Sequence, residues 1–386
     1  MTTPLQIGFI PLIDAAAVIT AVEKGFTRSE GLDVKLVREV SWSNVRDKLN
    51  IGLFDAAHIL APLPIASSLG LGHIKVPMVV PLTLNLNGNA ITVSPALHAA
   101  IMAEIDGDPF DPMATAKALS RVVAARRRSG GEPPTFGMTF PFSTHNYQLR
   151  FWMAAGGVDP DEDVRLVVLP PPFMVESIAS GQIDGFCVGA PWNSIAVDRG
   201  VGRILHFGSD ILQRAAEKVL AVRQQWAEKN PQTMSALVRA VFRAAEFAEA
   251  PDNRREVAQI LARSEYIGVD ASVILRTLEG RLKIAPDGTI REGDRYILFA
   301  REEASVPDPV QAAWLYAQMV RWRQTAMSPE ALKAAQDTFR PDLYGAALGS
   351  TGLPQPGSKA LGAFAGPRFD AGNIEAYFAS LAAGQG

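Results

Sequence analysis

The sequence predicts an α/β protein made of two similar lobes with a cleft between them, and three observations support this fold class. A strand-like run ending in proline occurs at residues 6–11 and again, 130 residues later, at residues 136–141. Residues 52–62 and 181–191 match at a constant offset of 129 and share glycine, aspartate, alanine and proline. Strand-like and helical stretches alternate in both halves, which predicts parallel sheets flanked by helices. Together these observations indicate a duplicated unit.

Each unit is expected to have the order strand, helix, strand, helix, strand. Both first helices end at glycine, the residue that most often terminates a helix. In chain order we expect, in the two units respectively, strands at 6–11 and 136–141, helices at about 14–25 and 144–156, strands at 32–37 and 164–169, and closing strands within 52–62 and 181–191.

Two further strand-like segments, residues 88–94 and 217–222, follow the two units and are interpreted as hinge crossings between the lobes. Lobe 1 is then expected to comprise residues 1–88 plus 219–386, and lobe 2 residues 89–218. From about Gln225 onward the pattern predicts a helical C-terminal extension, with an extended Gly/Pro-rich strap near its end. The expected helices are at residues 234–250, 252–264, 271–278, 309–325 and 329–339. The expected strap is at residues 352–367.

Composition and charge indicate an ordinary globular protein. The 386 residues are 48% hydrophobic and 20% charged with a net charge of -3, which gives no general attraction for nucleic acid or anionic membranes. The basic run 126–128 is interpreted as a solvated helix C-terminus, and a partner-docking patch is the alternative. No apolar stretch has the length of a membrane helix. Residues 1–26 lack the features of a signal peptide, so a cytoplasmic location is expected.

Several kinds of chemistry are not expected from this sequence. Cys187 is the single cysteine, which excludes an intrachain disulfide and a multi-cysteine zinc site. The five histidines show no metal-ligand spacing, so neither a metal nor another cofactor is predicted. Nucleophile-elbow, Walker and dinucleotide glycine motifs are absent, and we do not expect an enzyme.

A cleft between α/β lobes favours a small anion, because the positive N-terminal ends of helices converge on it. We expect Asp14 to cap the first helix of lobe 1 and Thr144 to cap the corresponding helix of lobe 2. A carboxylate cap neutralises its helix end, whereas a hydroxyl does not. The anion is therefore expected to prefer lobe 2. There His145 replaces the Ala15 of the first copy.

His145 and Lys218 are the first candidates for contact with such an anion. His145 is predicted at the first helical position and would donate a hydrogen bond, and the alternative is a surface histidine without a role. Lys218 begins the returning strand, where a buried lysine needs a charge partner. The alternative is an exposed salt bridge with the neighbouring Glu217.

Two other residues near the expected cleft are open to two interpretations. Trp42 lies between a strand and a helix and is either a ligand contact or a core residue. Asn89 is either a ligand contact or part of a turn, because Asn-Gly precedes it. His58 and Cys187 occupy equivalent positions on apolar strands and are predicted to be core residues.

Several stretches also resemble a known family of two-lobed binding proteins. They are IGFIPLIDAAAVITAVEKGF, SWSNVRDKL, FDAAHILAPLP, LNLNGNAITVS, MTFPFSTHNYQLRFWMAAGGVDP and FCVGAPWNS. Over nearly the whole chain the sequence is similar to the nitrate- and bicarbonate-binding proteins of ABC importers (NrtA/CmpA-like), and more closely to their cytoplasmic relatives, the NasS-type nitrate/nitrite sensors. The resemblance implies a type II periplasmic-binding-protein-like fold with the anion between the lobes. It assigns the anion contacts to Trp42, Asn89, His145, Gly189 and Lys218.

The sequence departs from that family at two positions. The importer proteins often have glutamine where Asn89 stands, so the amide donor is one methylene shorter here. The usual Gly-Glu-Pro-Trp is replaced by Gly-Ala-Pro-Trp at 189–192, which removes a carboxylate near the cleft. The bicarbonate-binding relatives have an acidic residue in place of Lys218 and recruit calcium. Lysine therefore implies nitrate or nitrite and no metal.

By resemblance, the function is that of a sensor. The ligand-free sensor holds an ANTAR-type, NasT-like RNA-binding antiterminator and releases it when nitrate or nitrite binds, without itself touching RNA or a membrane. A solute-binding receptor of a nitrate ABC importer is the first alternative. The second is an enzyme such as the thiamine-pyrimidine synthase that shares this fold, but that enzyme has a cysteine-rich motif and this chain has Cys187 alone.

Overall fold

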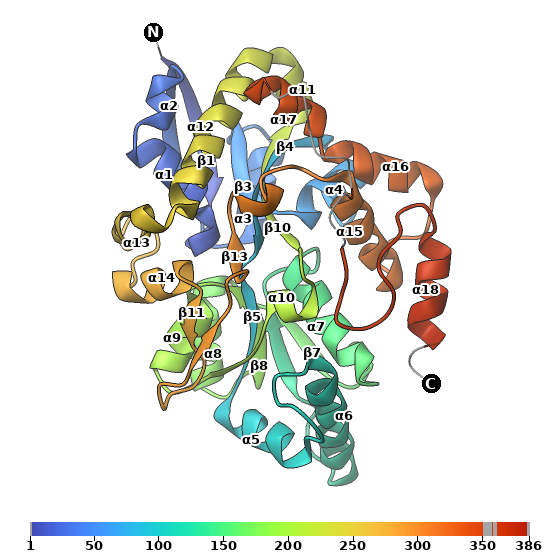
Figure 1. Ribbon diagram of the computed structural model, residues 1–386. Coiled ribbons are helices and arrows are strands. Elements are labelled where there is room, and N and C mark those ends of the chain that lie inside the picture. The colour runs from blue at the N-terminus through green and yellow to red at the C-terminus, as the bar shows by residue number, and fades with distance from the viewer. Residues whose placement is uncertain (1, 350–356, 358–360, 384–386) are drawn as a thin grey trace.

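The computed structural model describes residues 2–349, 357 and 361–383, and these contain two large sheets that form two lobes, together with a small two-stranded sheet of β11 (Arg281–Lys283) and β12 (Ile290–Glu292) (Figure 1). The upper sheet in that view has six strands in the order β13-β4-β10-β3-β1-β2. The three N-terminal strands are parallel, whereas β10 runs antiparallel to β3 and β4. The strands are β1 (Thr3–Phe9), β2 (Leu32–Arg38), β3 (Ala56–Leu60), β4 (Met78–Asn87), β10 (Ala216–Arg223) and β13 (Ile297–Leu298).

The lower sheet has five strands in the order β7-β6-β8-β5-β9. Strand β6 pairs in parallel with β7 and β8, and β5 pairs antiparallel with β8 and β9. The strands are β5 (Asn89–Val93), β6 (Thr135–Met138), β7 (Arg165–Val168), β8 (Gly185–Gly189) and β9 (Arg203–Phe207). The two-lobed α/β fold is confirmed, and the predicted parallel pairing is present in both sheets, but each sheet also has antiparallel strands and is therefore mixed.

The chain crosses between the lobes along strands, and these crossings explain why the sheets are mixed. Strand β4 ends at Asn87 and β5 begins at Asn89, so the chain leaves one sheet and enters the other within one residue. Asn87 and Gly88 have φ values of 62° and 98°, a left-handed conformation that glycine adopts without strain. A strand that enters a lobe from the cleft runs opposite to strands that end at the cleft. The chain returns in β10, which joins the upper sheet from Ala216, and the predicted lobe limits at 88/89 and 218/219 stay predictions.

Helices cover both sheets, and the duplicated order predicted from the sequence is present in each lobe. The upper lobe contains η1 (Ile13–Ala15), α1 (Ala16–Glu23), α2 (Phe26–Ser29), α3 (Trp42–Asn50) and α4 (Pro62–Leu69). The lower lobe contains α5 (Pro95–Glu104), α6 (Pro112–Arg128), α7 (Thr144–Ala155), η2 (Pro171–Phe173), α8 (Met174–Ala179), α9 (Trp192–Asp198) and α10 (Gly208–Ile211).

The C-terminal part is helical as predicted and packs mainly on the upper lobe, with α15, α16 and α18 along one side (Figure 1). Half of the predicted strap, residues 352–356 and 358–360, lies outside the described residues, and residues 362 and 364 hydrogen-bond to the backbone near α10. The elements are α11 (Gln224–Lys229), α12 (Pro231–Glu249), η3 (Pro251–Asn253), α13 (Arg254–Leu261), α14 (Ala271–Leu278), β11 (Arg281–Lys283), β12 (Ile290–Glu292), η4 (Arg301–Glu303), α15 (Pro309–Arg321), α16 (Pro329–Thr338), α17 (Pro341–Leu348) and α18 (Ile374–Ala383).

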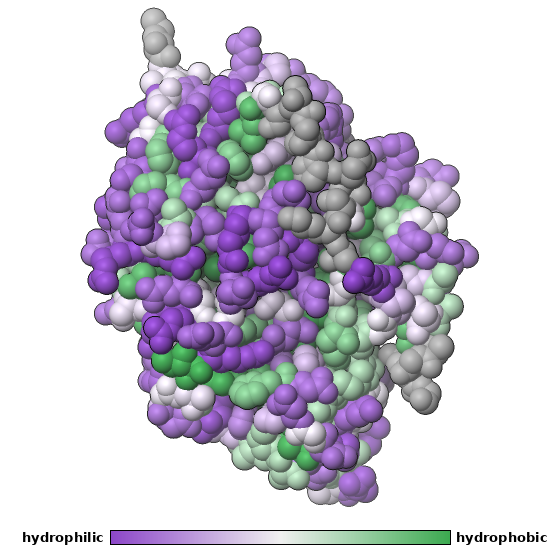
Figure 2. Space-filling model, viewed as in Figure 1, coloured by the Kyte–Doolittle hydropathy of each residue, from purple (hydrophilic) through white to green (hydrophobic). Residues whose placement is uncertain are grey.

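The apolar core extends across the junction of the lobes. Each of the two large clusters of buried apolar side chains contains residues from both sheets, for example Ile59 with Ile91 in one and Leu220 with Phe207 in the other. The face in Figure 2 is mainly hydrophilic, with separate small hydrophobic areas. Among the described residues, no helix combines the length and apolar character needed to cross a bilayer. Because both apolar clusters include residues of the two sheets, the lobes are packed against each other, and what lies between them is shielded from solvent.

Gly156, at the C-terminal end of α7, provides a test of the packing in the lower lobe. A Cβ at this position would overlap the backbone of Ala116 in α6, and backbone atoms cannot move aside as a flexible side chain does. We expect Gly156→Ala to lower the free energy of unfolding by about 1–3 kcal/mol in urea titrations. Gly362→Ala is the control, because a Cβ there would meet no atom of the described residues within 4 Å. A Gly156→Ala change no larger than that of the control would contradict this packing.

Candidate functional site

A cluster of polar side chains is buried at the junction of the lobes, between the ends of β5, β8 and β10 and the N-terminal ends of η1, α3 and α7. Asp14 is 2% exposed, and Asn89, His145, Glu217 and Lys218 are fully buried. Burying so many polar groups in an apolar junction costs free energy unless each finds a partner. Their contacts with one another therefore decide what the cluster can do.

A β-bulge in β10 brings Glu217 and Lys218 to the same side of the strand. The register against β4 shifts between Ala216 and Lys218 and again between Lys218 and Val219. Neighbouring side chains of a regular strand point to opposite faces, and a bulge redirects one of them. As a result Lys218 Nζ donates to Glu217 Oε1 at 2.7 Å, although the two residues are adjacent in the chain.

Lys218 is the central charge of the cluster. Its Nζ lies 2.8 Å from Asp14 Oδ2 and 2.7 Å from Glu217 Oε1, and 5.4 Å from the ring centre of Trp42. Burial alone would lower the pKa of Lys218, but the two carboxylates outweigh it and raise the pKa above its ordinary value. Lys218 is therefore a permanent cation at neutral pH. The salt bridge with Glu217 that we considered exposed is present and fully buried.

Asp14 anchors the upper-lobe side of the cluster. Its Oδ1 accepts from His58 Nε2 at 2.7 Å, and its Oδ2 faces Lys218. Burial disfavours its ionisation, yet Lys218 and His58 outweigh that effect and lower the pKa of Asp14 to about 2. The prediction that Asp14 caps its helix is wrong, because neither η1 nor α1 has a side-chain cap. The carboxylate pairs with buried donors instead.

Glu217 joins the two lobes. Its Oε2 accepts from Asn89 Nδ2 at 2.7 Å, and its Oε1 lies 3.3 Å from His145 Nε2. Burial raises the pKa of Glu217 and Asp14 adds to the rise, while Lys218 and Asn89 oppose it. The carboxylate of one lobe therefore contacts donors that belong to the other lobe.

His145 lies at the N-terminal end of α7, one position further into the helix than predicted. Ser143, and not Thr144, caps α7 by accepting from the Asn146 amide at 3.1 Å, so the predicted neutral cap is present on a different residue. Burial and then Lys218 hold the pKa of His145 well below its ordinary value, so its ring is neutral. Nδ1 bonds the Thr139 hydroxyl at 3.1 Å, whereas Nε2 makes no hydrogen bond within the described part of the chain.

Asn89 and Gly189 face each other as partners in the antiparallel pair of β5 and β8. Asn89 is a strand residue and not a turn residue, and its amide donates to Gln148 Oε1 at 3.0 Å as well as to Glu217. A Cβ on Gly189 would lie 3.0 Å from Asp14 Oδ2 and 3.6 Å from Asn89 Oδ1. Gly189 therefore lets the lower lobe approach the Asp14 carboxylate of the upper lobe.

Trp42 is the first residue of α3, whose N-cap Ser41 accepts from the Asn44 amide at 3.2 Å. The indole is 1% exposed, and its ring centre lies 5.6 Å from that of His58. The ring also contacts Lys218, and its Nε1 has no hydrogen-bond partner among residues 2–349, 357 and 361–383. Trp42 therefore forms an aromatic wall of the cluster.

All five residues assigned from the sequence meet in this cluster, and their role as ligand contacts stays a prediction. Sequence reasoning missed Asp14 as a cleft carboxylate and Glu217 as a buried one, and it assigned His58 to the core without its bond to Asp14. The signal was available for Asp14, which interrupts an otherwise apolar stretch. Cys187 is a buried core residue as predicted.

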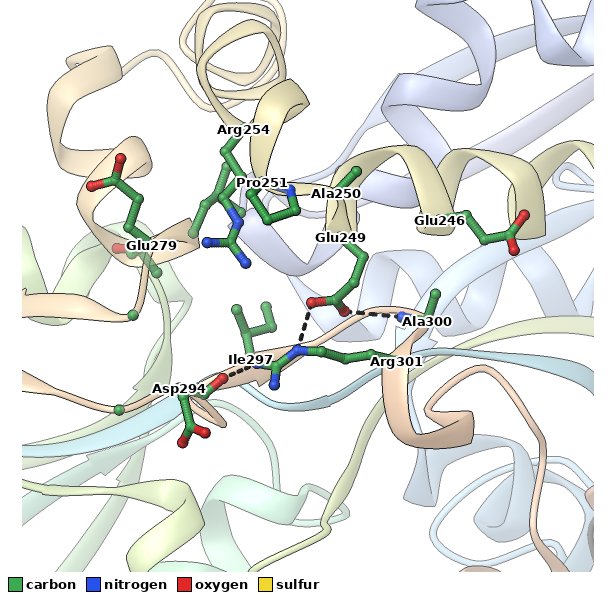
Figure 3. A pocket seen from close by; sticks show the side chains of 14 residues that line it. Glu246, Glu249, Ala250, Pro251, Arg254, Glu279, Asp294, Ile297, Ala300 and Arg301 are labelled. Atoms are coloured by element: carbon green, nitrogen blue, oxygen red, sulfur yellow. Dashed lines mark hydrogen bonds and ion pairs between the residues drawn. The ribbon is translucent and has the colours of Figure 1, made fainter.

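The structure contains no metal-binding cluster of three or more His, Cys, Asp or Glu side chains within its described ranges. A surface pocket of about 560 Å³ lies elsewhere, between α12, α14 and the segment that contains β13 (Figure 3). Figure 3 shows Glu249 directed toward Arg301, with Nε to Oε1 at 2.8 Å, so these charges satisfy each other. This pocket shares no residue with the cluster.

Comparisons with known proteins identify the family. The NMT1-like family model matches residues 1–262. The nitrate/nitrite binding protein NrtA of Synechococcus elongatus is 34% identical over 390 residues, which cover 98% of this chain and 86% of that protein. The chain belongs to the NrtA-like nitrate-binding family. The relatives that this chain covers over most of their length, such as this NrtA, are binding proteins and not enzymes.

The chain also matches part of a longer protein, and it matches a solved crystal structure. The chain is 35% identical to the nitrate import ATP-binding protein NrtC of Synechocystis over 91% of its own length but spans only 50% of that protein. The crystal structure of the periplasmic nitrate-binding protein NrtA from Synechocystis PCC 6803 superposes with a TM-score of 0.90 at 29% identity, covering 98% of both chains. The periplasmic-binding-protein-like fold is thus confirmed.

Removal of the central charge is the first test of the site. We expect Lys218→Met to reduce the free energy of unfolding by about 3–5 kcal/mol at pH 8, because Asp14 and Glu217 then lose their shared cation. The loss should shrink at pH 5.5, where carboxylates without a cation take up protons. Urea titrations at both pH values measure it.

Lys24→Met is the matched control, since Lys24 forms a partly exposed pair with Glu256 and its loss should cost less than about 1 kcal/mol. Equal losses in the two variants, or a Lys218→Met loss that does not change with pH, would contradict the central role of Lys218.

Proposed function

We propose that this protein binds nitrate or nitrite between its lobes and acts as a cytoplasmic sensor that controls an RNA-binding antiterminator. The observation that carries the binding proposal is His145 Nε2, a fully buried ring nitrogen at the junction of the lobes that makes no hydrogen bond among the described residues, although Glu217 Oε1 lies 3.3 Å away. Buried polar atoms are rarely left without partners, and those that are mark sites where another group binds.

The neighbouring groups supply what a small planar anion requires. Helix α7 directs its N-terminal end to the cluster, and its first turn contains no acidic residue to cancel the helix dipole. Lys218 supplies a full charge, the Asn89 amide supplies N–H donors, and the Trp42 ring supplies an apolar wall. Nitrate is monovalent and weakly hydrated, so such a site can replace its water shell.

The charge of Lys218 supports nitrate or nitrite over bicarbonate. The bicarbonate-binding relatives, by resemblance, have an acidic residue there and recruit calcium, and this chain has no suitable metal cluster in the part that the structure describes. The sensor proposal rests on the resemblance to NasS-type proteins. In it, closure of the lobes on the anion changes the surface held by the NasT-like antiterminator, which is then released. The alternative is a receptor that delivers nitrate to an ABC importer, as the NrtA relatives suggest.

Calorimetric titration of the protein with nitrate, nitrite and bicarbonate tests the ligand. We expect heat of binding and a rise in melting temperature with nitrate or nitrite, and neither with bicarbonate, with or without calcium. His145→Ala should weaken binding by about tenfold or more, because a buried donor to a charged group contributes about 1.5–3 kcal/mol.

His98→Ala is the control for that variant. His98 is a half-buried histidine on α5 that lies away from the cluster, and its loss should leave the affinity unchanged. If His145→Ala binds as tightly as His98→Ala, the histidine has no ligand role. If neither nitrate nor nitrite binds the wild-type protein, the ligand assignment fails.

The sensor role is tested by mixing the purified protein with a NasT-like antiterminator and separating the mixture by size-exclusion chromatography. We expect one complex without nitrate and two separate proteins with it, while chloride at equal ionic strength has no effect. His145→Ala should hold the partner at nitrate concentrations that release it from the wild-type protein. A complex that never forms, or that nitrate leaves intact, would favour the importer-receptor alternative.

A further inference from the structure

The Glu217 carboxylate already lies where the predicted anion shell converges: it accepts hydrogen bonds from Asn89 and Lys218, and His145 Nε2 lies close to it without a hydrogen bond. Its oxygens meet Asn89 Nδ2 at 2.7 Å, Lys218 Nζ at 2.7 Å and His145 Nε2 at 3.3 Å. These are three of the five residues assigned to the anion. A carboxylate presents two oxygens in one plane with one shared negative charge, and any two oxygens of nitrate present the same pattern.

The charges of the cluster leave no room for a second ionised acceptor. The titratable and charged groups that face Glu217 come from every element around it: Lys218 on β10, Asp14 on η1, His145 on α7, Cys187 on β8 and His58 on β3. Only Lys218 is positive, because both histidines are held neutral by burial. With Asp14 and Glu217 ionised, an added anion would bring three negative charges to one buried cation, which is strongly unfavourable.

We propose that ionised Glu217 is an internal competitor of the anion, and that the anion binds together with one proton, which Glu217 takes up from solvent. This inference rests on the proposed anion-binding function and adds a specificity-determining residue to it. In the bound state the Glu217 oxygen that gained the proton becomes a donor to the anion, and Asn89 and His145 turn their N–H groups to it. No bond other than this O–H bond forms, and the cluster keeps its net charge.

The Glu217 environment supports this proton uptake. Burial and the neighbouring Asp14 raise the pKa of Glu217, so the proton is bound more readily than by an exposed glutamate. Asp14 cannot take the same role, since its pKa of about 2 keeps it ionised. Asp14 also contacts neither Asn89 nor His145 through a hydrogen bond, and instead accepts from His58.

Glu217→Gln tests the competition, because the amide keeps the shape of the side chain and, like the protonated acid, offers a donor, but cannot ionise. Nitrate and nitrite affinities of both proteins are measured by calorimetry at pH 6, 7 and 8. For the wild type we expect the affinity to fall by up to tenfold per pH unit across the part of this range in which Glu217 ionises. Glu217→Gln should show a flat profile and bind at least tenfold more tightly than the wild type at pH 8.

Glu39→Gln is the matched control. Glu39 is also buried, at 5% exposed, and pairs with Lys48 and Asn44 outside the cluster. Removal of its charge should preserve the wild-type affinity and pH profile. If Glu217→Gln behaves like Glu39→Gln, or binds more weakly than the wild type, the competition is disproved while the anion site itself stands.

A second measurement uses only the wild-type protein and so does not depend on how the variant folds. Titrations at pH 8 in buffers of different ionisation enthalpy report the protons exchanged on binding. We expect close to one proton taken up per anion bound, and heats that do not differ between buffers would overturn the proposal. Failure of the proposed function gives a different result, since then neither protein binds nitrate or nitrite at any of the three pH values.

Discussion

The burial of one lysine between two carboxylates is the interaction on which this structure depends. The Lys218 ammonium lies within 2.8 Å of both Asp14 and Glu217, at a point where the two sheets meet and all three side chains are buried. None of the three charges is tolerable alone in that environment: the lysine is stabilised by both carboxylates, and each carboxylate is stabilised by the lysine. Asp14 and Lys218 are contributed by the upper lobe, and Glu217 carries the contact onward to Asn89 of the lower lobe. The arrangement of the lobes and the electrostatics of the cleft are therefore set by the same few atoms.

This arrangement also explains how a duplicated fold acquires one site. The two copies supply the same order of strands and helices, yet they contribute different chemistry at the cleft. The upper copy supplies a carboxylate at the turn after β1 and an aromatic ring at the start of α3. The lower copy supplies a neutral helix cap and a neutral imidazole at the start of α7. An anion in this cleft meets an uncompensated helix end on one side and a lysine held by carboxylates on the other.

The sequence was sufficient for the fold and for choosing five residues that meet in one buried cluster, and insufficient for the charge balance of that cluster. The offset of 129–130 residues predicts the duplicated units, and glycine at the end of α7 predicts where that helix stops. His145, Asn89 and Lys218 could be placed at a cleft because strand ends and helix starts have local signals. The antiparallel direction of β5 and β10 has no such signal, since it depends on which lobe the chain enters. The partners of Asp14 cannot be predicted from the sequence either. His58 and Lys218 are 44 and 204 positions away from Asp14, and only the folding of the chain brings them into contact with it.

The bulge in β10 has a consequence for how such cleft proteins diverge. It places the side chains of two consecutive residues, Glu217 and Lys218, in one small polar volume. Most binding sites collect their charges from distant segments, so that a new ligand preference requires coordinated changes in several loops. Here two of the three charges of the cluster are adjacent residues of a single strand, and only Asp14 comes from a distant segment. Substitutions confined to these two adjacent positions would therefore change the charge of the cluster while leaving the apolar packing of both lobes in place.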